Sequence, residues 1–228
     1  MSILNPRGSV VELAAALCDI ESVSGNEAAI ADAVEAQLRS CAHLEVIRDG
    51  DAVVAMTRLG RERRVVIAGH IDTVPVNDNL PTRRELRDGV DTLVGRGTVD
   101  MKGGVAVQLA LAVELVEPAV DVTWVFYDNE EVSGERNGLA RIARTRPDLL
   151  AADFAVLCEP TNAQVEGGCN GSARVILRYH GARAHSARPW MGRNAIHAAA
   201  GAIVTLAGWD ADEIEVDGLV YREALNAV

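Results

Sequence analysis

Apolar residues along this chain occur in two patterns, helical spacing and short continuous runs. Helical spacing predicts helices at residues 9–19, 27–40, 102–116, 136–145 and 193–207. Short runs rich in Val and Ile predict strands at residues 44–47, 52–56, 65–68, 122–127, 153–158, 173–180 and 219–225. Strands that alternate with helices predict an α/β fold, with a mostly parallel mixed sheet covered on both faces.

Turn-forming residues separate these elements. Residues 73–95 are polar and indicate a long loop with a turn at Asp88-Gly89. Residues 22–27 lead into the helix at 27–40, and Ser24 and Asn26 are its candidate N-caps.

The alternation of strands and helices changes near residue 172. We therefore expect one domain over residues 1–172, and the first half of an inserted α+β domain over residues 173–228. The chain stops at Val228 inside a predicted strand, so we expect a C-terminally truncated sequence.

Composition and charge narrow the class of protein. A net charge of -11 argues against nucleic acid, whose phosphates would repel this surface. No apolar run reaches the length of a membrane span, and the first seven residues contain no signal-peptide core. The four cysteines form no C-x-x-C pair and indicate reduced thiols. We expect a cytoplasmic protein without nucleic-acid or membrane partners.

Acidic and imidazole side chains follow the predicted strands. The carboxyl ends of strands in an α/β sheet converge on one crevice, so these groups are expected to meet. One His among several carboxylates is typical of a metal site with hard and borderline ligands. The chain is therefore interpreted as a metallohydrolase. The candidate residues are His70, Asp72, Asp100, Glu130, Glu131 and Glu159.

Each residue type suits a different task at such a site. His70 can bind metal through one ring nitrogen while Asp72 accepts the other N–H. The two oxygens of Asp100 can bridge two metals. Adjacent Glu130 and Glu131 point apart on extended backbone, so one can bind metal while the other acts as a general base. Each motif alone also fits an ordinary alternative, and only their joint order favours the site. The alternatives are a surface His beside a solvated Asp, a phosphate-binding loop around Asp100, an acidic loop at Glu130-Glu131 and a plain strand end at Glu159.

The order of the motifs resembles a known family from about residue 10 onward. It is similar to the dinuclear zinc aminoacylase, carboxypeptidase and desuccinylase superfamily, and most of all to its actinobacterial-type succinyl-diaminopimelate desuccinylases. The segments that carry the resemblance are GHIDTVPV at 69–76, GRGTVDMKGG at 95–104, EE at 130–131, EPT at 159–161 and GARAHSARP at 181–189.

The resemblance implies two Zn²⁺ ions, for which Co²⁺ could substitute. His70 and Glu159 would hold one ion and Glu131 the other, with Asp100 as the bridge. Glu130 would be the general base and Asp72 would orient His70. The catalytic His185 would stabilise the oxyanion at the active site of a partner subunit, in a homodimer formed through the lid domain. A cis peptide bond is implied between Asp100 and Met101.

The implied reaction is hydrolysis of an N-acyl amide on a small acylated amino acid. The favoured substrate is N-succinyl-LL-2,6-diaminopimelate, which gives succinate and LL-2,6-diaminopimelate in lysine and diaminopimelate biosynthesis. Acetylornithine deacetylase, dipeptidase and carboxypeptidase are the alternatives within the superfamily. An inactive metal-binding or partner-binding fragment is the alternative of another class.

Two departures from the family pattern weigh on these expectations. No residue matches the family's further His at the second zinc, because His180, His185 and His197 all lie in the lid-like segment. One metal site is therefore expected to be incomplete, with little activity from these 228 residues alone. The Arg-rich turn of many desuccinylases is replaced by Cys169-Asn170-Gly171.

Overall fold

The computed structural model describes residues 4–228 and divides into two compact units, Met1–Ala163 and Gln164–Val228. Each unit is described by itself. The domain boundary after residue 172 stays a prediction, because compactness does not by itself define a domain. No helix among residues 4–228 is long and apolar enough to cross a membrane.

A five-stranded sheet organises the first unit, in the order β1-β2-β6-β3-β7. The neighbouring strands β6, β3 and β7 run parallel to one another. Strand β1 pairs antiparallel with β2, and β2 pairs antiparallel with β6. The predicted α/β fold with a mixed sheet is confirmed. The strands are β1 (Glu45–Asp49), β2 (Ala52–Met56), β3 (Arg64–His70), β6 (Asp121–Tyr127) and β7 (Phe154–Leu157).

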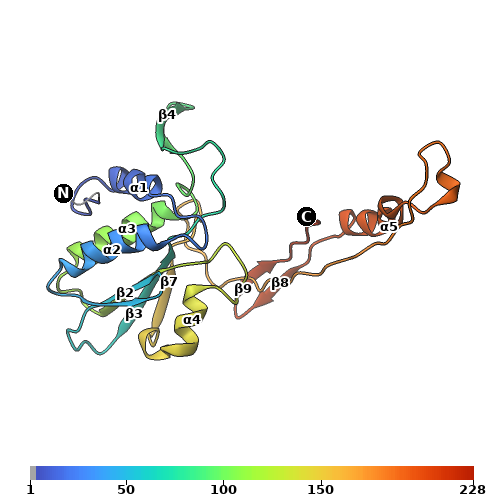
Figure 1. Cartoon of the computed structure of the whole chain (residues 1–228). Helices are drawn as coiled ribbons and strands as arrows, with labels where there is room; N and C mark the ends of the chain where they lie inside the picture. Colours follow the sequence, from blue (N-terminus) through green and yellow to red (C-terminus); the bar gives the residue numbers. More distant parts are fainter. Residues whose placement is uncertain (1–3) are drawn as a thin grey trace. The chain divides into compact units, whose positions relative to one another are not determined.

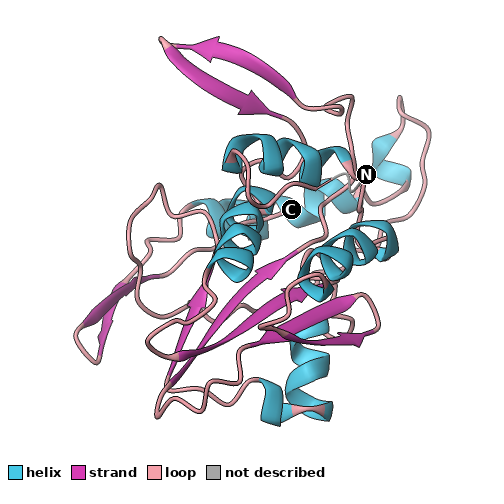
Figure 2. Ribbon diagram, turned by 90° about the vertical axis from the view of Figure 1, so that its left-hand side faces the viewer, coloured by secondary structure: helices cyan, strands magenta, loops and turns pink. Residues whose placement is uncertain are grey.

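Helices cover both faces of this sheet (Figures 1 and 2). The face on one side packs against α1 (Val10–Asp19), α2 (Ala28–Arg39) and α3 (Lys102–Glu114). The other face packs against α4 (Gly138–Thr145) and the short η1 (Pro147–Leu149). Successive side chains of a strand point to opposite faces, so Trp124 and Phe126 enter the first core and Val125 enters the second. Every residue of β6 is buried, as expected for a central strand.

The second unit contains one helix and one hairpin. Helix α5 (Ala195–Ala207) begins after Asn194, whose side chain accepts hydrogen bonds from the N–H groups of Ile196 and His197. Strands β8 (Glu213–Val216) and β9 (Leu219–Arg222) pair antiparallel, and η2 (Pro189–Met191) is a single short turn.

The prediction of a long loop at residues 73–95 is wrong, because this segment contains a hairpin formed by β4 (Arg83–Arg87) and β5 (Val90–Val94). The predicted turn is correct: Asp88 and Gly89 both have positive φ, as a tight hairpin turn requires. Charged pairs stabilise this hairpin, among them Arg84 with Asp91 across the strands. The two strands of this hairpin lack the alternation of buried apolar and exposed polar residues by which a strand is usually predicted.

Other expectations also fail. Residues 173–180 form no regular strand, and β8 lies between residues 207 and 219, where no strand was predicted. The N-cap position of α2 is Glu27, and neither Ser24 nor Asn26 caps the helix. The hydroxyl of Ser24 instead donates to Asp72, a residue that only the folded chain brings near it.

Asp121 at the start of β6 joins the strand to the loop between β2 and β3. Its carboxylate accepts hydrogen bonds from the N–H groups of Leu59 (2.9 Å) and Arg61 (3.0 Å) and from the Thr57 hydroxyl (2.7 Å). Burial acts to raise the pKa of Asp121, but these hydrogen bonds hold it below its usual value.

We expect Asp121→Asn to destabilise the fold at neutral pH by about 1–3 kcal/mol, because hydrogen bonds to a charged acceptor are lost. The pKa of Asp121 is lowered in the folded state, so its contribution is present above the unfolded pKa of about 3.9. It should disappear as pH falls through the lower folded value. Urea unfolding of parent and variant from pH 7 to pH 3 measures this. Asp88→Asn, on an exposed turn, is the matched control, and an equal loss there would contradict the assignment.

Candidate active site

His70 ends β3 and is almost completely buried, at 1% exposed. Its Nε2 lies 3.0 Å from Asp100 Oδ1 and 3.9 Å from Glu159 Oε1. Its Nδ1 lies 3.1 Å from the main-chain oxygen of Asp72 and 3.4 Å from Asp72 Oδ1. Burial acts to lower the pKa of His70, but Asp72, Glu159 and Asp100 raise it to about 9. One ring nitrogen thus faces Asp72 and the other faces a group of carboxylates, an arrangement typical of a metal-binding His.

Three loops bring carboxylates to this nitrogen. Asp100 lies before α3, Glu131 follows β6 and Glu159 follows β7. Ligand atoms of His70, Asp100 and Glu131 all lie within 4.8 Å of one another. Parallel strands β3, β6 and β7 end at the same edge of the sheet, which explains why residues distant in sequence meet there.

The carboxylates of this group repel one another. Burial, together with the charges of Asp100 and Glu130, raises the pKa of Glu131. Burial likewise raises the pKa of Glu159, against the opposing effect of His70 and with the same carboxylates adding to the rise. A divalent cation would relieve this repulsion, and imidazole nitrogen with carboxylate oxygens is a donor set that Zn²⁺ accepts. The residues therefore fit a metal ion.

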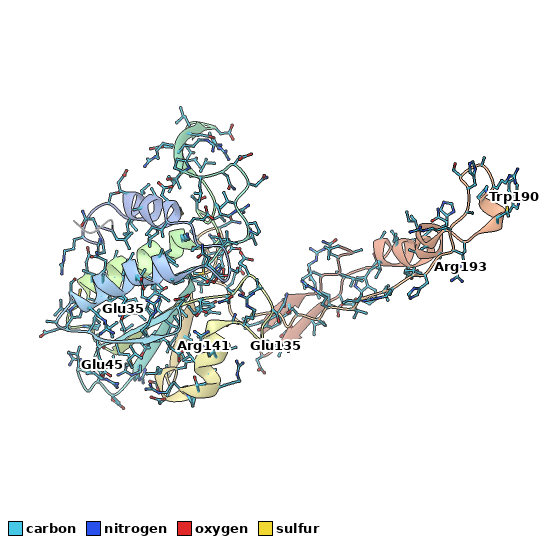
Figure 3. The ribbon with its side chains drawn as sticks, viewed as in Figure 1. Glu35, Glu45, Glu135, Arg141, Trp190 and Arg193 are labelled. Atoms are coloured by element: carbon cyan, nitrogen blue, oxygen red, sulfur yellow. The ribbon has the colours of Figure 1, made fainter. Side chains whose placement is uncertain are left out.

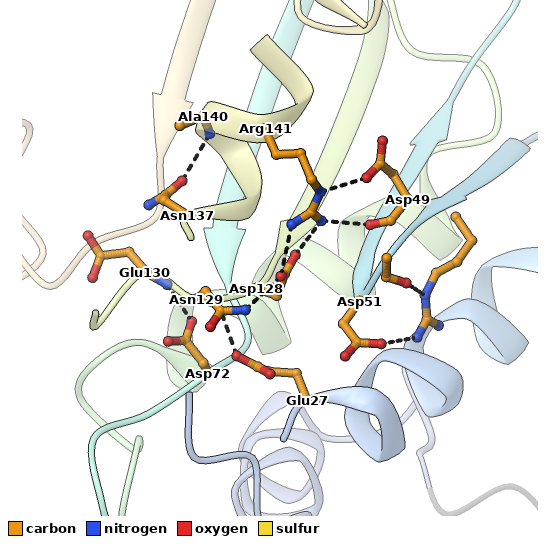
Figure 4. A network of polar contacts seen from close by, with 12 residues as sticks. Glu27, Asp49, Asp51, Asp72, Asp128, Asn129, Glu130, Asn137, Ala140 and Arg141 are labelled. Carbon is orange, nitrogen blue, oxygen red and sulfur yellow. Dashed lines mark hydrogen bonds and ion pairs between the residues drawn. The ribbon is translucent and has the colours of Figure 1, made fainter. Parts of the chain in front are cut away.

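Asp72 is fully buried and receives several hydrogen bonds. Its Oδ1 accepts from the N–H of Glu130 (3.0 Å), and its Oδ2 accepts from the N–H of Glu131 (3.1 Å) and from the Ser24 hydroxyl (2.6 Å). Burial acts to raise the pKa of Asp72, but these bonds and His70 lower it. Figure 4 shows Asp72 beneath the main chain at Glu130. Asp72 therefore contacts the main chain of Glu130 and Glu131 as well as the imidazole of His70.

Glu130 and Glu131 differ in what their side chains contact. Glu131 belongs to the converging group, whereas the Glu130 carboxylate makes no hydrogen bond or ion pair with any residue of the described chain. In Figure 4 this carboxylate points away from Asp72. Asn129 immediately before it has a φ of 57°, a left-handed conformation that turns the chain at the end of β6. The two glutamates thus have different surroundings, and the prediction that they point apart stays a prediction.

The loop that carries Asp100 is fixed by neighbouring residues. The peptide bond between Asp100 and Met101 is cis, which confirms the expectation from the resemblance. Lys102 donates its N–H to the Gly97 carbonyl at 2.8 Å, and its buried ammonium donates to the carbonyls of Leu17 and Ile20. Burial lowers the pKa of Lys102 to about 8. Sequence reasoning gave Lys102 no role, although a Lys in the first turn of an apolar helix was a usable signal.

His185 lies in the second unit, where it is exposed. Its Nδ1 accepts a hydrogen bond from the N–H of Ala187 at 3.1 Å. His180 and His197 lie in the same unit. A catalytic role for His185 stays a prediction.

A cavity of about 410 Å³ lies beside the ligand group. Val74, the 95–99 loop, Asp100 and Glu131 line it. Arg96 belongs to this lining, and its Nε is buried without a hydrogen-bond partner among residues 4–228. The cavity therefore combines two candidate metal ligands with a basic side chain.

Residues 66–221 match the family model described as peptidase family M20/M25/M40. The chain belongs to this family. The match covers both the strand-end carboxylates and the segment around His185, and it confirms the superfamily that the motifs indicated.

Two relatives extend the M20 match to almost the whole chain. A Corynebacterium glutamicum protein named succinyl-diaminopimelate desuccinylase is 46% identical over 226 residues, which cover 97% of this chain and 60% of that protein. A Mycobacterium tuberculosis H37Rv protein, whose name assigns the same activity provisionally, is 53% identical over 227 residues, which cover 99% of this chain and 63% of that protein. The chain spans less than two thirds of the length of these relatives.

Solved structures of two peptidases share the fold. A tripeptidase from Staphylococcus aureus subsp. aureus Mu50 aligns with a TM-score of 0.57 and 19% identity over 98% of this chain and 65% of its own. Aminopeptidase PepT from Bacillus cereus aligns with a TM-score of 0.55 and 16% identity, over 96% and 65% of the two chains.

We expect Asp100→Asn and Glu159→Gln each to weaken Zn²⁺ binding by the 228-residue chain by more than about 100-fold, because each removes a charged ligand that lies beside His70 Nε2. Glu135→Gln is the matched control, since Glu135 is exposed on the loop before α4 (Figure 3). Calorimetric titration with Zn²⁺ measures the affinities. Equal losses in all three variants would show that nonspecific acidic charge, rather than these ligands, binds the ion.

Proposed function

We propose that this chain carries the metal-binding and base-bearing part of an N-acyl amide hydrolase. The observation that carries the proposal is the convergence of His70, Asp100 and Glu131 beside the unpaired carboxylate of Glu130. The proposed substrate is N-succinyl-LL-2,6-diaminopimelate, in lysine and diaminopimelate biosynthesis. The names of the two bacterial relatives support this choice.

Two zinc ions, or Co²⁺ in their place, are the proposed cofactors. His70 and Glu159 would hold one ion, Glu131 would hold the other and Asp100 would bridge them. The distances from His70 Nε2 to Asp100 and Glu159 support the first site. When bound, such ions would polarise the scissile carbonyl and lower the pKa of the attacking water.

Glu130 is the proposed general base. Its main-chain N–H is fixed by Asp72, while its carboxylate is free of protein partners among residues 4–228 and can therefore accept a proton. Glu130 would take the proton from the attacking water and return it to the leaving amine. Asp72 would keep the imidazole of His70 oriented, with its Nε2 toward the carboxylates.

Arg96 supports a substrate that carries carboxylates. It is the one basic residue among those lining the described cavity, and its guanidinium makes no ion pair with the described residues. A guanidinium without an acidic partner suits the bidentate binding of a carboxylate. This matters because the chain has no Arg-rich turn before residue 173.

The remaining elements of the proposal concern the assembly. His185 would stabilise the oxyanion from a partner subunit, in a homodimer formed through the second unit. The free cysteines support a cytoplasmic location.

The test compares succinate release from N-succinyl-LL-2,6-diaminopimelate with deacetylation of N-acetylornithine and cleavage of a dipeptide. It uses the 228-residue chain, and a chimera in which the unmatched part of the M. tuberculosis relative continues the chain. We expect the chimera to prefer the succinylated substrate and to lose activity on chelation. Faster deacetylation or dipeptide cleavage would show that N-acetylornithine or a dipeptide, and not the succinylated compound, is the substrate. A metal-loaded chimera that hydrolyses none of the three would contradict the proposal that the chain is part of an enzyme.

In the active chimera, Glu130→Gln should lower kcat by about 10²–10⁴-fold with little change in KM, because a general base acts on the chemical step. Zinc content should stay at the parental value, since Glu130 is not assigned as a ligand. Glu135→Gln on the same loop should leave kcat unchanged. Loss of zinc together with activity would show that Glu130 and Glu131 have been assigned the wrong way round.

A further inference from the structure

Residues 22–27, between α1 and α2, lie against the end of β3. The Ser22 hydroxyl donates to the Ile71 carbonyl at 2.7 Å, and the N–H of Thr73 donates to the Ser22 carbonyl at 2.9 Å. The N–H of Ser24 in turn donates to the Thr73 carbonyl at 3.1 Å. The 22–27 segment therefore follows the chain on either side of Asp72 as a short parallel bridge.

Ser24 reaches the carboxylate of Asp72 from this bridge. Its hydroxyl lies 2.6 Å from Asp72 Oδ2, the same oxygen that accepts the N–H of Glu131. Hydrogen bonds to ionised acceptors are short and strong, so Ser24 restricts the carboxylate on which the Glu131 main chain rests. Without this hydroxyl, the buried Oδ2 of Asp72 would lose one of its hydrogen-bond donors from the protein.

Glu27 holds the other side of the same turn. Its fully buried carboxylate accepts from the N–H of Gly25 at 2.8 and 2.9 Å and from the N–H of Asn129 at 3.1 Å. Asn129 has the left-handed backbone that directly precedes Glu130. Figure 4 shows Glu27 and Asp72 on either side of this turn, each bonded to its main chain.

We propose that Ser24 and Glu27 are positioning residues for the metal site. They would act through Asp72 and Asn129 on the main chain of Glu130 and Glu131, and so set the direction of the base and of one metal ligand. The inference rests on the proposed function. Ser24 is 48 residues from Asp72 in the sequence, and Glu27 is 102 residues from Asn129. The 22–27 segment itself contains no assigned metal ligand.

The experiment uses the 228-residue chain and two readouts, Zn²⁺ affinity by calorimetric titration and the visible absorption spectrum of bound Co²⁺. Ser24→Ala should weaken Zn²⁺ binding by about 10-fold, the low end of the effect of removing a direct partner of a metal ligand, because Ser24 contacts Asp72, which in turn orients the ligand His70. It should also alter the Co²⁺ bands, because the ligand geometry changes. Ser24→Thr keeps a hydroxyl and should restore both readouts.

Ser40→Ala is the matched control. The Ser40 hydroxyl donates to the Gln37 carbonyl at 2.6 Å on the exposed end of α2, so its loss should change neither readout. Glu27→Gln provides a second variant, because an amide offers one acceptor oxygen where the carboxylate offers two. It should weaken Zn²⁺ binding as well, and it carries the test if thermal unfolding without metal shows that Ser24→Ala does not fold.

The outcomes separate this inference from the proposed function. Parental affinity and an unchanged Co²⁺ spectrum in Ser24→Ala would overturn the positioning role and leave the metal site standing. The same conclusion would follow if Ser24→Thr were as weak as Ser24→Ala. A parent chain that binds neither ion would instead reject the metal site itself, before any variant is compared.

Discussion

The buried carboxylate of Asp72 is the constraint on which the rest of the site depends. An ionised carboxylate without partners would be strongly unfavourable in this environment, because burial removes its solvation by water. Its donors come from separate segments: the Ser24 hydroxyl before α2 and the N–H groups of Glu130 and Glu131 after β6. The imidazole of His70 lies beside it at the end of β3. Satisfying this single charge therefore fixes the relative positions of three segments that carry the chemistry.

Acidic residues at the ends of the strands fall into two groups according to their partners. Asp128 accepts two hydrogen bonds from Arg141, which also binds Asp49 and so ties α4 to β1 (Figure 4). Asp121 is likewise fully bonded at the opposite end of β6. Glu131 and Glu159 have no such compensation, and their pKa values are raised by burial and by neighbouring carboxylates. Asp128 and Asp121, which have hydrogen-bond partners, stabilise the fold. Glu131 and Glu159 instead form a concentration of negative charge that a metal ion would neutralise.

The sheet supplies the rigidity that such crowding requires. Repulsion among carboxylates would separate them on flexible loops, but here Glu131 and Glu159 follow parallel strands of one sheet, in which side chains of β3 and β6 pack into both cores. Trp124 and Phe126 of β6 are buried against the helices on one face, and Val125 against α4 on the other. Lys102 adds a further link, since its ammonium connects the start of α3 to the end of α1 beside the loop of Asp100. Packing energy far from the site thus holds like charges together within it.

The sequence by itself determined the elements with strong apolar patterns, the α/β fold and the residues that meet at the strand ends. Periodicity reports burial directly, so α1, α3 and β6 were predictable, and strand polarity indicated that His70, Asp100 and Glu131 would converge. The hairpin of β4 and β5 was not predictable in this way, because none of its residues is fully buried and several are charged. The strand expected at residues 173–180 failed because an apolar run becomes a strand only where a partner strand is available. Only the tertiary structure decided the roles of Ser24 and Glu27. Local sequence indicated a helix cap at Ser24 and only the first residue of a helix at Glu27, but their hydrogen bonds depend on which distant groups, the Asp72 carboxylate and the Asn129 N–H, lie beside them after folding.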